Sequence, residues 1–178
     1  MRMTRELVSK LGLTVLTVFI ILFSVGCGKE NNPVVDETYN PTVDPTNFVT
    51  KIDNKYFPLV PGTTFIYQGK TEDGTERNEV YVSQKTKTIL GVTCIVIEDR
   101  VWVNDDLVES TLDWYAQDKV GDVWYFGEDS KEYDKGAVVS TKGSWEAGVN
   151  GAKPGIIMQA NPQIGKSYRQ EYYKGEAE

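Results

Sequence analysis

Apolar and polar positions alternate along most of the chain after Lys51, and turn residues interrupt the alternation about every ten positions. This part of the chain lacks the helical period that a long amphipathic helix would show. Because the connections are short, neighbouring strands are expected to be antiparallel. The pattern predicts an all-β fold, an antiparallel meander forming a curved sheet or incomplete β-barrel, with strands at 63–70, 76–84, 85–90, 93–103 and 107–117.

A different pattern occupies residues 1–26. Three basic residues, Arg2, Arg5 and Lys10, precede an apolar run from Leu11 to Gly26. This is the pattern of a helical secretory signal. The run of about 16 residues is shorter than the roughly 20 that a membrane-spanning helix needs, so a retained anchor is the lesser alternative.

The run ends in FSVGCG, which resembles the lipobox of bacterial lipoproteins, with Ser24 where that family usually has Leu. The resemblance implies that Cys27, preceded by Gly26, receives a diacylglyceryl thioether before the signal is cleaved; ordinary cleavage is the alternative. Gly28 is not the Asp that resembles an inner-membrane retention signal. The expected product is an exported, membrane-anchored lipoprotein of the outer membrane and periplasm or of the cell surface.

Residues 27–50 are polar and contain Pro33, Pro41 and Pro45, which predicts a lipidated Cys27 on a flexible, disordered tether. The antiparallel β-domain is assigned to residues 51–178. Removing residues 1–26 takes away three basic residues and one acidic residue, leaving 16 basic and 25 acidic residues, a net charge of −9. Such an acidic domain is not expected to bind nucleic acid, and anionic headgroups should repel it.

The aromatic stretch LDWYAQDKVGDVWYFGED covers residues 112–129. If residues 118–122 form a five-residue hairpin loop, strand alternation places Ala116 opposite Trp124 and Trp114 opposite Phe126. The face that gathers Trp114, Trp124 and Phe126 is predicted to be dry, and the opposite face, with Tyr115, is predicted to be less buried. The dry face is interpreted as the wall of a core or as the lining of a ligand cavity.

The glycine-rich segment from Gly143 to Gly165 does not alternate. It carries Trp145, Ile157 and Met158, whose apolar side chains must be covered. Two interpretations follow: the segment plugs one end of the sheet, or it lines the mouth of a cavity for an apolar or sugar ligand.

Catalytic signals are weak, because the chain has no histidine and no G-x-S-x-G, phosphate-loop or paired-cysteine motif. Cys94 is interpreted as a small apolar strand residue. Asp113, Glu128 and Glu146, the last beside Trp145, are the candidates for a glycosidase-like carboxylate pair. The alternative is a solvated sheet surface. Neither a cofactor nor a metal is predicted, and DKVGD at 118–122 is interpreted as a turn rather than a calcium loop.

The blocks YFPLVPGTTFIY, LDWYAQDKVGDVWYFGED and KGSWEAGVNGAKPGIIMQANPQIGKSYRQEYYKGEAE are similar to a family of uncharacterised bacterial secreted or lipoprotein β-domains. That resemblance implies an architecture without an activity, and it implies further strands after Glu178. A hairpin meander behind a lipobox also resembles, at the level of fold, the half-barrel lipoprotein carriers of the LolA/LolB type.

The sequence therefore predicts a non-enzymatic envelope lipoprotein that binds a hydrophobic or amphiphilic small molecule in its concave face. The expected lining is Trp114, Trp124, Phe126, Trp145, Ile157 and Met158. Docking of another envelope protein through an open sheet edge is the first alternative, and glycan hydrolysis is the second.

Overall fold

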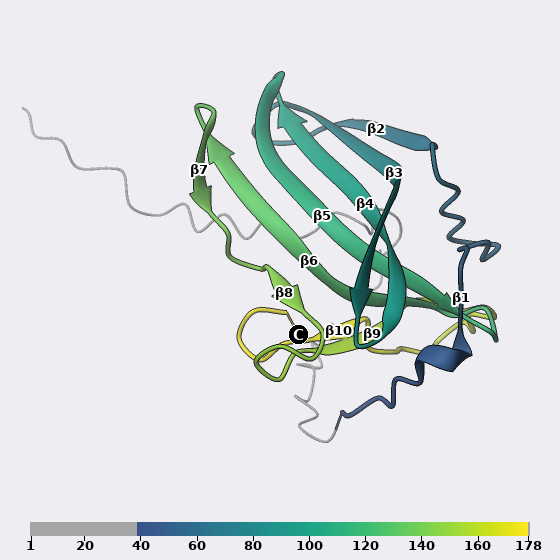
Figure 1. Cartoon of the computed structure of the whole chain (residues 1–178). Coiled ribbons are helices and arrows are strands. Elements are labelled where there is room, and N and C mark those ends of the chain that lie inside the picture. The colour runs from purple at the N-terminus through teal and green to yellow at the C-terminus, as the bar shows by residue number, and fades with distance from the viewer. Residues whose placement is uncertain (1–38, 178) are drawn as a thin grey trace, which may run out of the picture. The chain divides into compact units, whose positions relative to one another are not determined.

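The computed structural model describes residues 39–177, which form a single curled antiparallel sheet (Figure 1). The predicted signal peptide and the lipidation site at Cys27 lie outside these residues. Within the described range, no helix is both long and apolar enough to cross a membrane. The elements are η1 (Pro45–Asn47), β1 (Phe48–Val49), β2 (Thr64–Lys70), β3 (Thr75–Ile89), β4 (Val92–Val103), β5 (Asp106–Asp118), β6 (Val123–Asp134), β7 (Ala137–Ser140), β8 (Trp145–Glu146), β9 (Lys153–Met158) and β10 (Glu171–Tyr172).

The strand order confirms the predicted meander. Strands β2 to β6 are each paired with the next along the chain, and the full order is β10-β9-β6-β5-β4-β3-β2. Three short strands complete the sheet, because β1 pairs with β5 while β7 and β8 pair with β6. The two predicted strands at 76–84 and 85–90 are one strand, β3, whose register shifts between Val82 and Thr86. The all-β curled half-barrel is therefore the fold that the alternation predicts.

The β5–β6 hairpin forms as predicted. Ala116 is opposite Trp124, and the carboxylate of Asp118 accepts hydrogen bonds from the backbone N–H groups of Val120, Gly121 and Asp122. Its second oxygen accepts from the Trp124 indole at 2.9 Å. The loop is a turn in which backbone amides and an indole occupy the carboxylate, as the turn interpretation requires.

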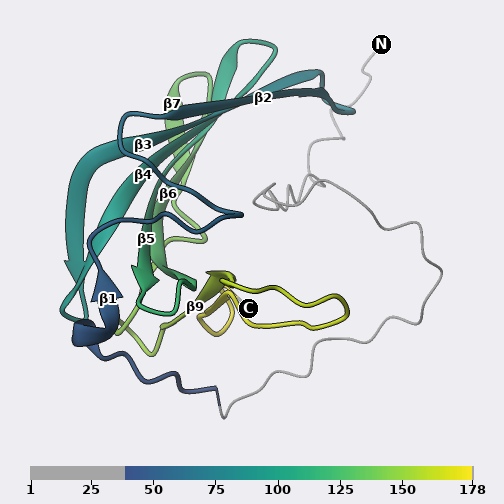
Figure 2. The ribbon, with the colours of Figure 1, turned by 90° about the vertical axis from the view of Figure 1, so that its right-hand side faces the viewer.

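The sheet has an inner and an outer face. We call the face that carries Tyr115 the inner face, because segment 50–62 crosses it and Phe57 lies edge-on against the Tyr115 ring, with centroids 5.6 Å apart (Figure 2). Trp114 belongs to the outer face. The end of the β3–β4 hairpin covers this part of the outer face, since the Lys87 ammonium lies 3.3 Å from the Trp114 ring centroid and 2.7 Å from the Glu146 carboxylate.

The prediction that only one face of the hairpin is dry is wrong. Trp114 and Phe126 on the outer face are 6% and 0% exposed, but Tyr115 and Tyr125 on the inner face are also only 8% and 4% exposed. The inner pair stacks with ring centroids 4.7 Å apart, beneath Phe57. Segments far away in the sequence cover each face, so local alternation could not reveal the second burial.

The segment assigned to the tether is partly structured. Asp44 caps η1. β1 pairs antiparallel with the end of β5, which places Phe48 opposite Asp118. The Phe48 ring then packs edge-on against Trp124 and Phe126, at 6.0 and 5.6 Å between centroids. The ordered part therefore begins before Lys51, because one aromatic side chain in a polar segment completes the outer core.

The C-terminal segment returns to β6. β8 and β9 pair with successive parts of β6, and β10 pairs with β9. β10 is only two residues long. Trp145 on β8 is 4% exposed and lies edge-on to Tyr125, at 5.3 Å between centroids. The non-alternating segment thus supplies two strands that pair with β6 and one core aromatic side chain.

Candidate functional site

The inner face carries a ladder of matched side chains on β5 and β6. Glu109 is opposite Glu132, Thr111 opposite Ser130, and Asp113 opposite Glu128. Tyr115 and Tyr125 follow as the next matched pair. We call the four acidic residues Glu109, Asp113, Glu128 and Glu132, together with Asp99 on β4, the carboxylate ladder. Asp99 joins it because it is opposite Thr111.

Hydroxyl groups hold the middle of the ladder. Thr111 and Ser130 are 3% and 8% exposed, and their hydroxyls lie 3.1 Å apart in a hydrogen bond. At the deep end, the Tyr125 hydroxyl donates to the Asp113 carboxylate at 2.6 Å. These contacts partly replace the water that the carboxylates lose on burial.

Burial and like charge both oppose ionisation of the ladder. Desolvation raises the pKa of Asp113 to about 8, and the neighbouring carboxylates of Asp99 and Glu109 add to the rise. Desolvation and the charge of Asp113 raise the pKa of Glu128 to about 9, and desolvation raises the pKa of Asp99 to about 6. Burial also raises the pKa of Glu109. Asp113 and Glu128 are therefore protonated near neutral pH, whereas Asp99 is largely ionised.

Charge is segregated between the two faces of the sheet. Cross-strand partners share a face, and by this criterion or by their ion pairs every basic residue of β2 to β6 belongs to the outer face. There, Arg100 and Lys85 meet Glu98, and Lys131 meets Asp129. Across residues 39–177, none of the ion pairs includes a member of the carboxylate ladder. The basic residues are Lys70, Arg77, Lys85, Lys87, Arg100 and Lys131.

Two side chains from the C-terminal segment lie at the end of the carboxylate ladder that holds Asp113 and Glu128. Burial raises the pKa of Glu171 on β10, whose charge in turn raises the pKa of Asp113 and Glu128. The Trp145 indole N–H is buried and finds no acceptor within hydrogen-bonding distance in the described residues. It is nevertheless near enough to the Glu171 carboxylate to oppose the rise of that pKa.

The predicted ligand-lining residues are mainly core residues. Trp114, Phe126 and Trp145 are buried on opposite faces of the sheet, and Trp124, Ile157 and Met158 are half-buried against the core. The six residues do not share one surface, because Trp145 contacts the inner-face Tyr125 while Trp124 contacts the outer-face Phe48. Their packing supports the interpretation of the aromatic stretch as core wall.

The structure separates the three catalytic candidates. Asp113 and Glu128 are direct cross-strand partners, whereas Glu146 lies on the outer face in an ion pair with Lys87. Asp113 is 5% exposed and is bonded to Tyr125, so a glycan chain could not reach its carboxylate without displacing the covering residues. Residues 39–177 contain no group of three acidic, histidine or cysteine side chains placed to hold a metal ion.

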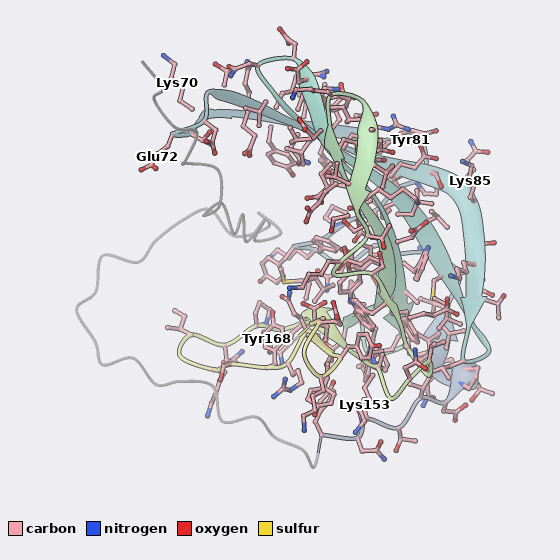
Figure 3. The ribbon with its side chains drawn as sticks, turned by 90° about the vertical axis from the view of Figure 1, so that its left-hand side faces the viewer. Lys70, Glu72, Tyr81, Lys85, Lys153 and Tyr168 are labelled. Atoms are coloured by element: carbon pink, nitrogen blue, oxygen red, sulfur yellow. The ribbon has the colours of Figure 1, made fainter. Side chains whose placement is uncertain are left out.

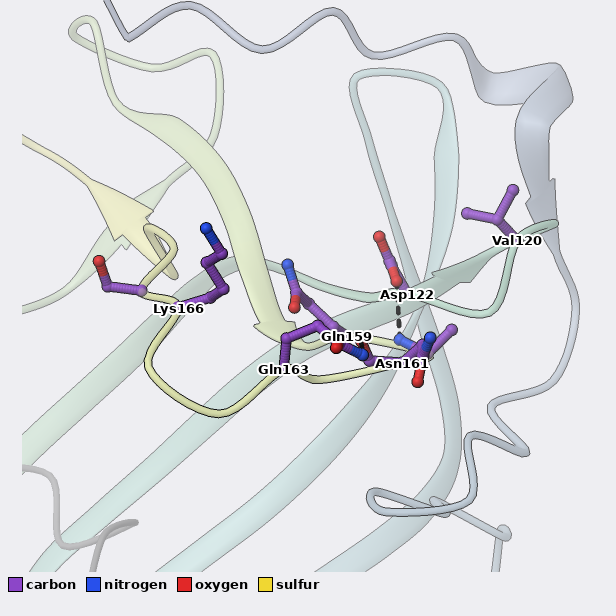
Figure 4. A pocket seen from close by; sticks show the side chains of 8 residues that line it. Val120, Asp122, Gln159, Asn161, Gln163 and Lys166 are labelled. Atoms are coloured by element: carbon purple, nitrogen blue, oxygen red, sulfur yellow. Dashed lines mark hydrogen bonds between the residues drawn. The ribbon is translucent and has the colours of Figure 1, made fainter.

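A polar hollow of about 580 Å³ lies at one end of the sheet, between the β5–β6 turn and the loop after β9 (Figure 4). The Asp122 carboxylate accepts a hydrogen bond from the Ala160 N–H at 2.7 Å and joins the two segments. The lining is amide-rich and lacks aromatic rings: Val120, Asp122, Gln159, Ala160, Asn161, Gln163, Lys166 and Ser167. The second half of segment 143–165 therefore does border a hollow, but a polar one.

Sequence reasoning singled out Asp113 and Glu128 as candidates for a carboxylate pair but missed the ladder to which they belong. The signal was present as the alternating acidic positions Glu109 and Asp113 on β5 and Glu128 and Glu132 on β6. Without the register, these residues were indistinguishable from a solvated face, because nothing in the sequence shows that the opposite face holds all the basic partners.

The fold and site together define an all-β half-barrel with an acidic inner face. Comparison of the chain with protein-family models, curated proteins and solved structures finds no match in any of the three. The resemblances to secreted β-domains and to half-barrel carriers therefore stay predictions, and function has to be argued from the site itself.

Proposed function

We propose that this chain is an envelope lipoprotein whose β-domain is a non-enzymatic binding module, and that its inner face binds a cationic amphiphile. The diacylglyceryl anchor is assigned to Cys27, outside the described residues. Export and membrane attachment follow from the basic and apolar pattern of residues 1–26 and from the lipobox-like Gly26-Cys27.

The single observation that carries the ligand class is the segregation of charge. Like charges directly opposite each other destabilise a sheet, yet Glu109 faces Glu132, and Asp113 faces Glu128 where burial and the neighbouring carboxylates raise both pKa values. Every basic residue of β2 to β6 is on the other face. A protein tolerates such a conflict most readily where it serves a site. A bound cation would relieve the repulsion between Glu109 and Glu132 without any change of fold.

Apolar side chains beside the ladder favour an amphiphile over a simple cation. Cross-strand pairing places Phe65 opposite Val80, Tyr67 opposite Asn78, and Asn78 opposite Val101, all on the inner face. Val101 is in turn opposite Glu109. A ligand with an ammonium head and an apolar chain could place its head between the carboxylates of Glu109 and Glu132 and its chain along β2 to β4.

Isothermal titration calorimetry tests the proposal with dodecyltrimethylammonium as the probe and dodecyl sulfate as the anionic control. We expect only the cationic probe to bind, and the double change Glu109→Gln with Glu132→Gln to weaken its binding at least about tenfold, the effect of losing charged partners. Asp129→Asn is the matched control, because Asp129 is on the same strand with its side chain on the outer face, paired with Lys131.

The affinity for the cation should also rise with pH. Asp99, with a pKa of about 6, and Glu109, with a raised pKa, must be ionised to attract an ammonium group, and binding the cation should release protons from them. Titrations at pH 5, 7 and 9 check this. Equal affinity for both detergents, or an affinity that does not change with pH, would overturn the assignment of a cationic ligand.

Docking through a sheet edge is the second candidate, and one observation favours it. Among residues 39–177, strand β2 pairs with β3 alone, and its Ile66 and Tyr67 are 60% and 50% exposed. An extended segment of another envelope protein could add a strand there. An Ile66→Lys change separates the two candidates, because it should prevent docking at this edge and leave amphiphile binding on the ladder intact.

A further inference from the structure

Tyr39 is clasped by the C-terminal hairpin. Its hydroxyl donates to the Pro154 carbonyl at 2.9 Å, and the Lys153 ammonium donates to the Tyr39 carbonyl. The guanidinium carbon of Arg169 lies 5.4 Å from the Tyr39 ring centroid and 5.2 Å from that of Tyr172. We call these contacts of Tyr39 with Lys153, Pro154 and Arg169 the clasp. The clasp fixes Tyr39 beside β9 and β10, and from Tyr39 the chain leads back to Cys27.

The position of Tyr39 limits how far the domain can lie from Cys27. Only residues 28–38 separate Cys27 from Tyr39. A chain of that length spans at most about 40 Å when fully extended. A lipid on Cys27 would therefore keep the β9–β10 end of the domain closer to the bilayer surface than a tether reaching residue 50 would.

The loop beside the clasp has the chemistry of a membrane-contacting segment. We call residues 159–168 the projecting loop, because it extends from the body of the domain after β9 (Figure 2). Ile164 at its tip is 106% exposed and Tyr168 is 38% exposed. Lys166 lies between them and Arg169 follows. No acidic residue occurs from 159 to 170, although the mature chain is strongly acidic.

The base of the projecting loop is fixed. The Ile156 N–H donates to the Arg169 carbonyl at 2.9 Å, and the Ala160 N–H donates to Asp122. Figure 3 shows Tyr168 and Lys153 at one end of the domain, and Lys70 and Glu72 at the other. The exposed apolar tip, the basic side chains and the clasp thus lie at the same end.

We propose that the projecting loop docks on an anionic phospholipid surface, with Ile164 and Tyr168 entering the headgroup region and Lys166 and Arg169 meeting lipid phosphates. Apolar and aromatic side chains flanked by basic residues are the composition that binds this interface. Lys and Arg are attracted by anionic lipid, which offsets the repulsion of the acidic domain. The inference rests on the lipid anchor of the proposed function and is independent of the inner-face ligand.

The test places an environment-sensitive dye at the loop tip of the full lipidated chain. Ile164→Cys is labelled with an NBD maleimide, because Cys94 is 0% exposed and does not compete for the dye, and Cys27 carries the lipid. Val139→Cys on β7, where Val139 is 61% exposed, is the matched control. The labelled proteins are reconstituted into vesicles of phosphatidylethanolamine and phosphatidylglycerol and recovered by flotation.

The expected result is a blue shift and a gain of NBD emission at position 164 but not at 139. Lys166→Glu should reduce the emission shift at position 164 without reducing flotation. Lys70→Glu, at the other end of the domain, should leave the emission shift at position 164 unchanged. A floating protein with unshifted emission at 164, or with equal shifts at both positions, overturns loop docking and leaves the anchor intact. A protein that fails to float, as Cys27→Ser should, overturns both. Calorimetry on the inner face remains a separate result.

Discussion

At the residue scale, Tyr115 is as much a core residue as Trp114, with 8% and 6% of their surfaces exposed. The Tyr115 ring lies between Phe57 and Tyr125, at 5.6 and 4.7 Å between centroids. Gln117, next on the same face, is 6% exposed because its side-chain oxygen accepts from the backbone N–H groups of Asp53 and Asn54. One polar side chain therefore holds the segment that seals the inner face.

We expect Tyr115→Ala and Trp114→Ala to lower the free energy of unfolding by similar amounts, about 3 to 5 kcal/mol each, the usual result of emptying a large buried aromatic site. Tyr56→Ala is the control, since Tyr56 is 50% exposed, and it should cost less than about 1 kcal/mol. Urea denaturation of the three variants measures this. A Tyr115→Ala loss as small as that of Tyr56→Ala would show that the inner face is not closed.

At the element scale, a single glycine brings β6 and β8 together. The β5–β6 register shifts between Asp113 and Tyr115, which leaves Phe126 and Gly127 opposite Trp114. Gly127 has φ of 132°, and a methyl group there would meet the Trp145 carbonyl oxygen and lie 2.9 Å from the Glu146 Cα. The bulge thus lets β8 approach β6 closely enough to deliver Trp145 to the inner core.

Gly127→Ala should therefore destabilise the domain by at least about 2 kcal/mol, through backbone strain and overpacking together. Gly69→Ala on β2 is the matched control, because Gly69 has an ordinary strand φ and no atom within 4 Å of the added carbon. Thermal and urea unfolding of both variants are the measurements. Similar stabilities for the two would mean that β8 can move away from β6 at little cost.

The sequence predicts the β5–β6 hairpin but not the bulge at Gly127. The short loop after Asp118 and the alternation of Trp114 and Ala116 were enough to set the Ala116–Trp124 register, and with it the hairpin. They could not give the bulge, because an isolated glycine such as Gly127 can mark either a bulge or a close approach of another backbone, and only the strand register tells which. Nor could they give the docking of Phe48, which is one aromatic residue in a polar segment, or the pairing of 145–158 with β6, which depends on partners distant in sequence.

At the scale of the whole molecule, the ladder makes stability depend on pH. Folding raises the pKa of Asp99, Asp113 and Glu128 to about 6, 8 and 9, so the folded state holds protons that the unfolded chain has lost. This contribution is complete below the unfolded pKa of about 4 and is lost as the pH rises through about 6 to 9. Tyr115, Tyr125, Glu132 and Glu171 face the same cluster and add no positive charge to it.

Between pH 5 and pH 9 we expect the free energy of unfolding to fall by an amount on the order of a few kcal/mol. The double change Asp113→Asn with Glu128→Gln should remove most of that slope, because an amide cannot ionise and its oxygen can still accept the Tyr125 hydrogen bond. Urea denaturation across this range compares the two proteins. An equal slope in both would show that the buried pair ionises without cost.

Cys94 is buried, and its thiol is poorly reactive. Its thiol is 0% exposed, and burial raises its pKa to about 12, so almost none is present as the reactive thiolate at neutral pH. It is the free cysteine of the described residues. Oxidising conditions therefore offer residues 39–177 neither a disulfide to form nor an accessible thiol to oxidise. Their folding equilibrium should be the same under oxidising and reducing conditions.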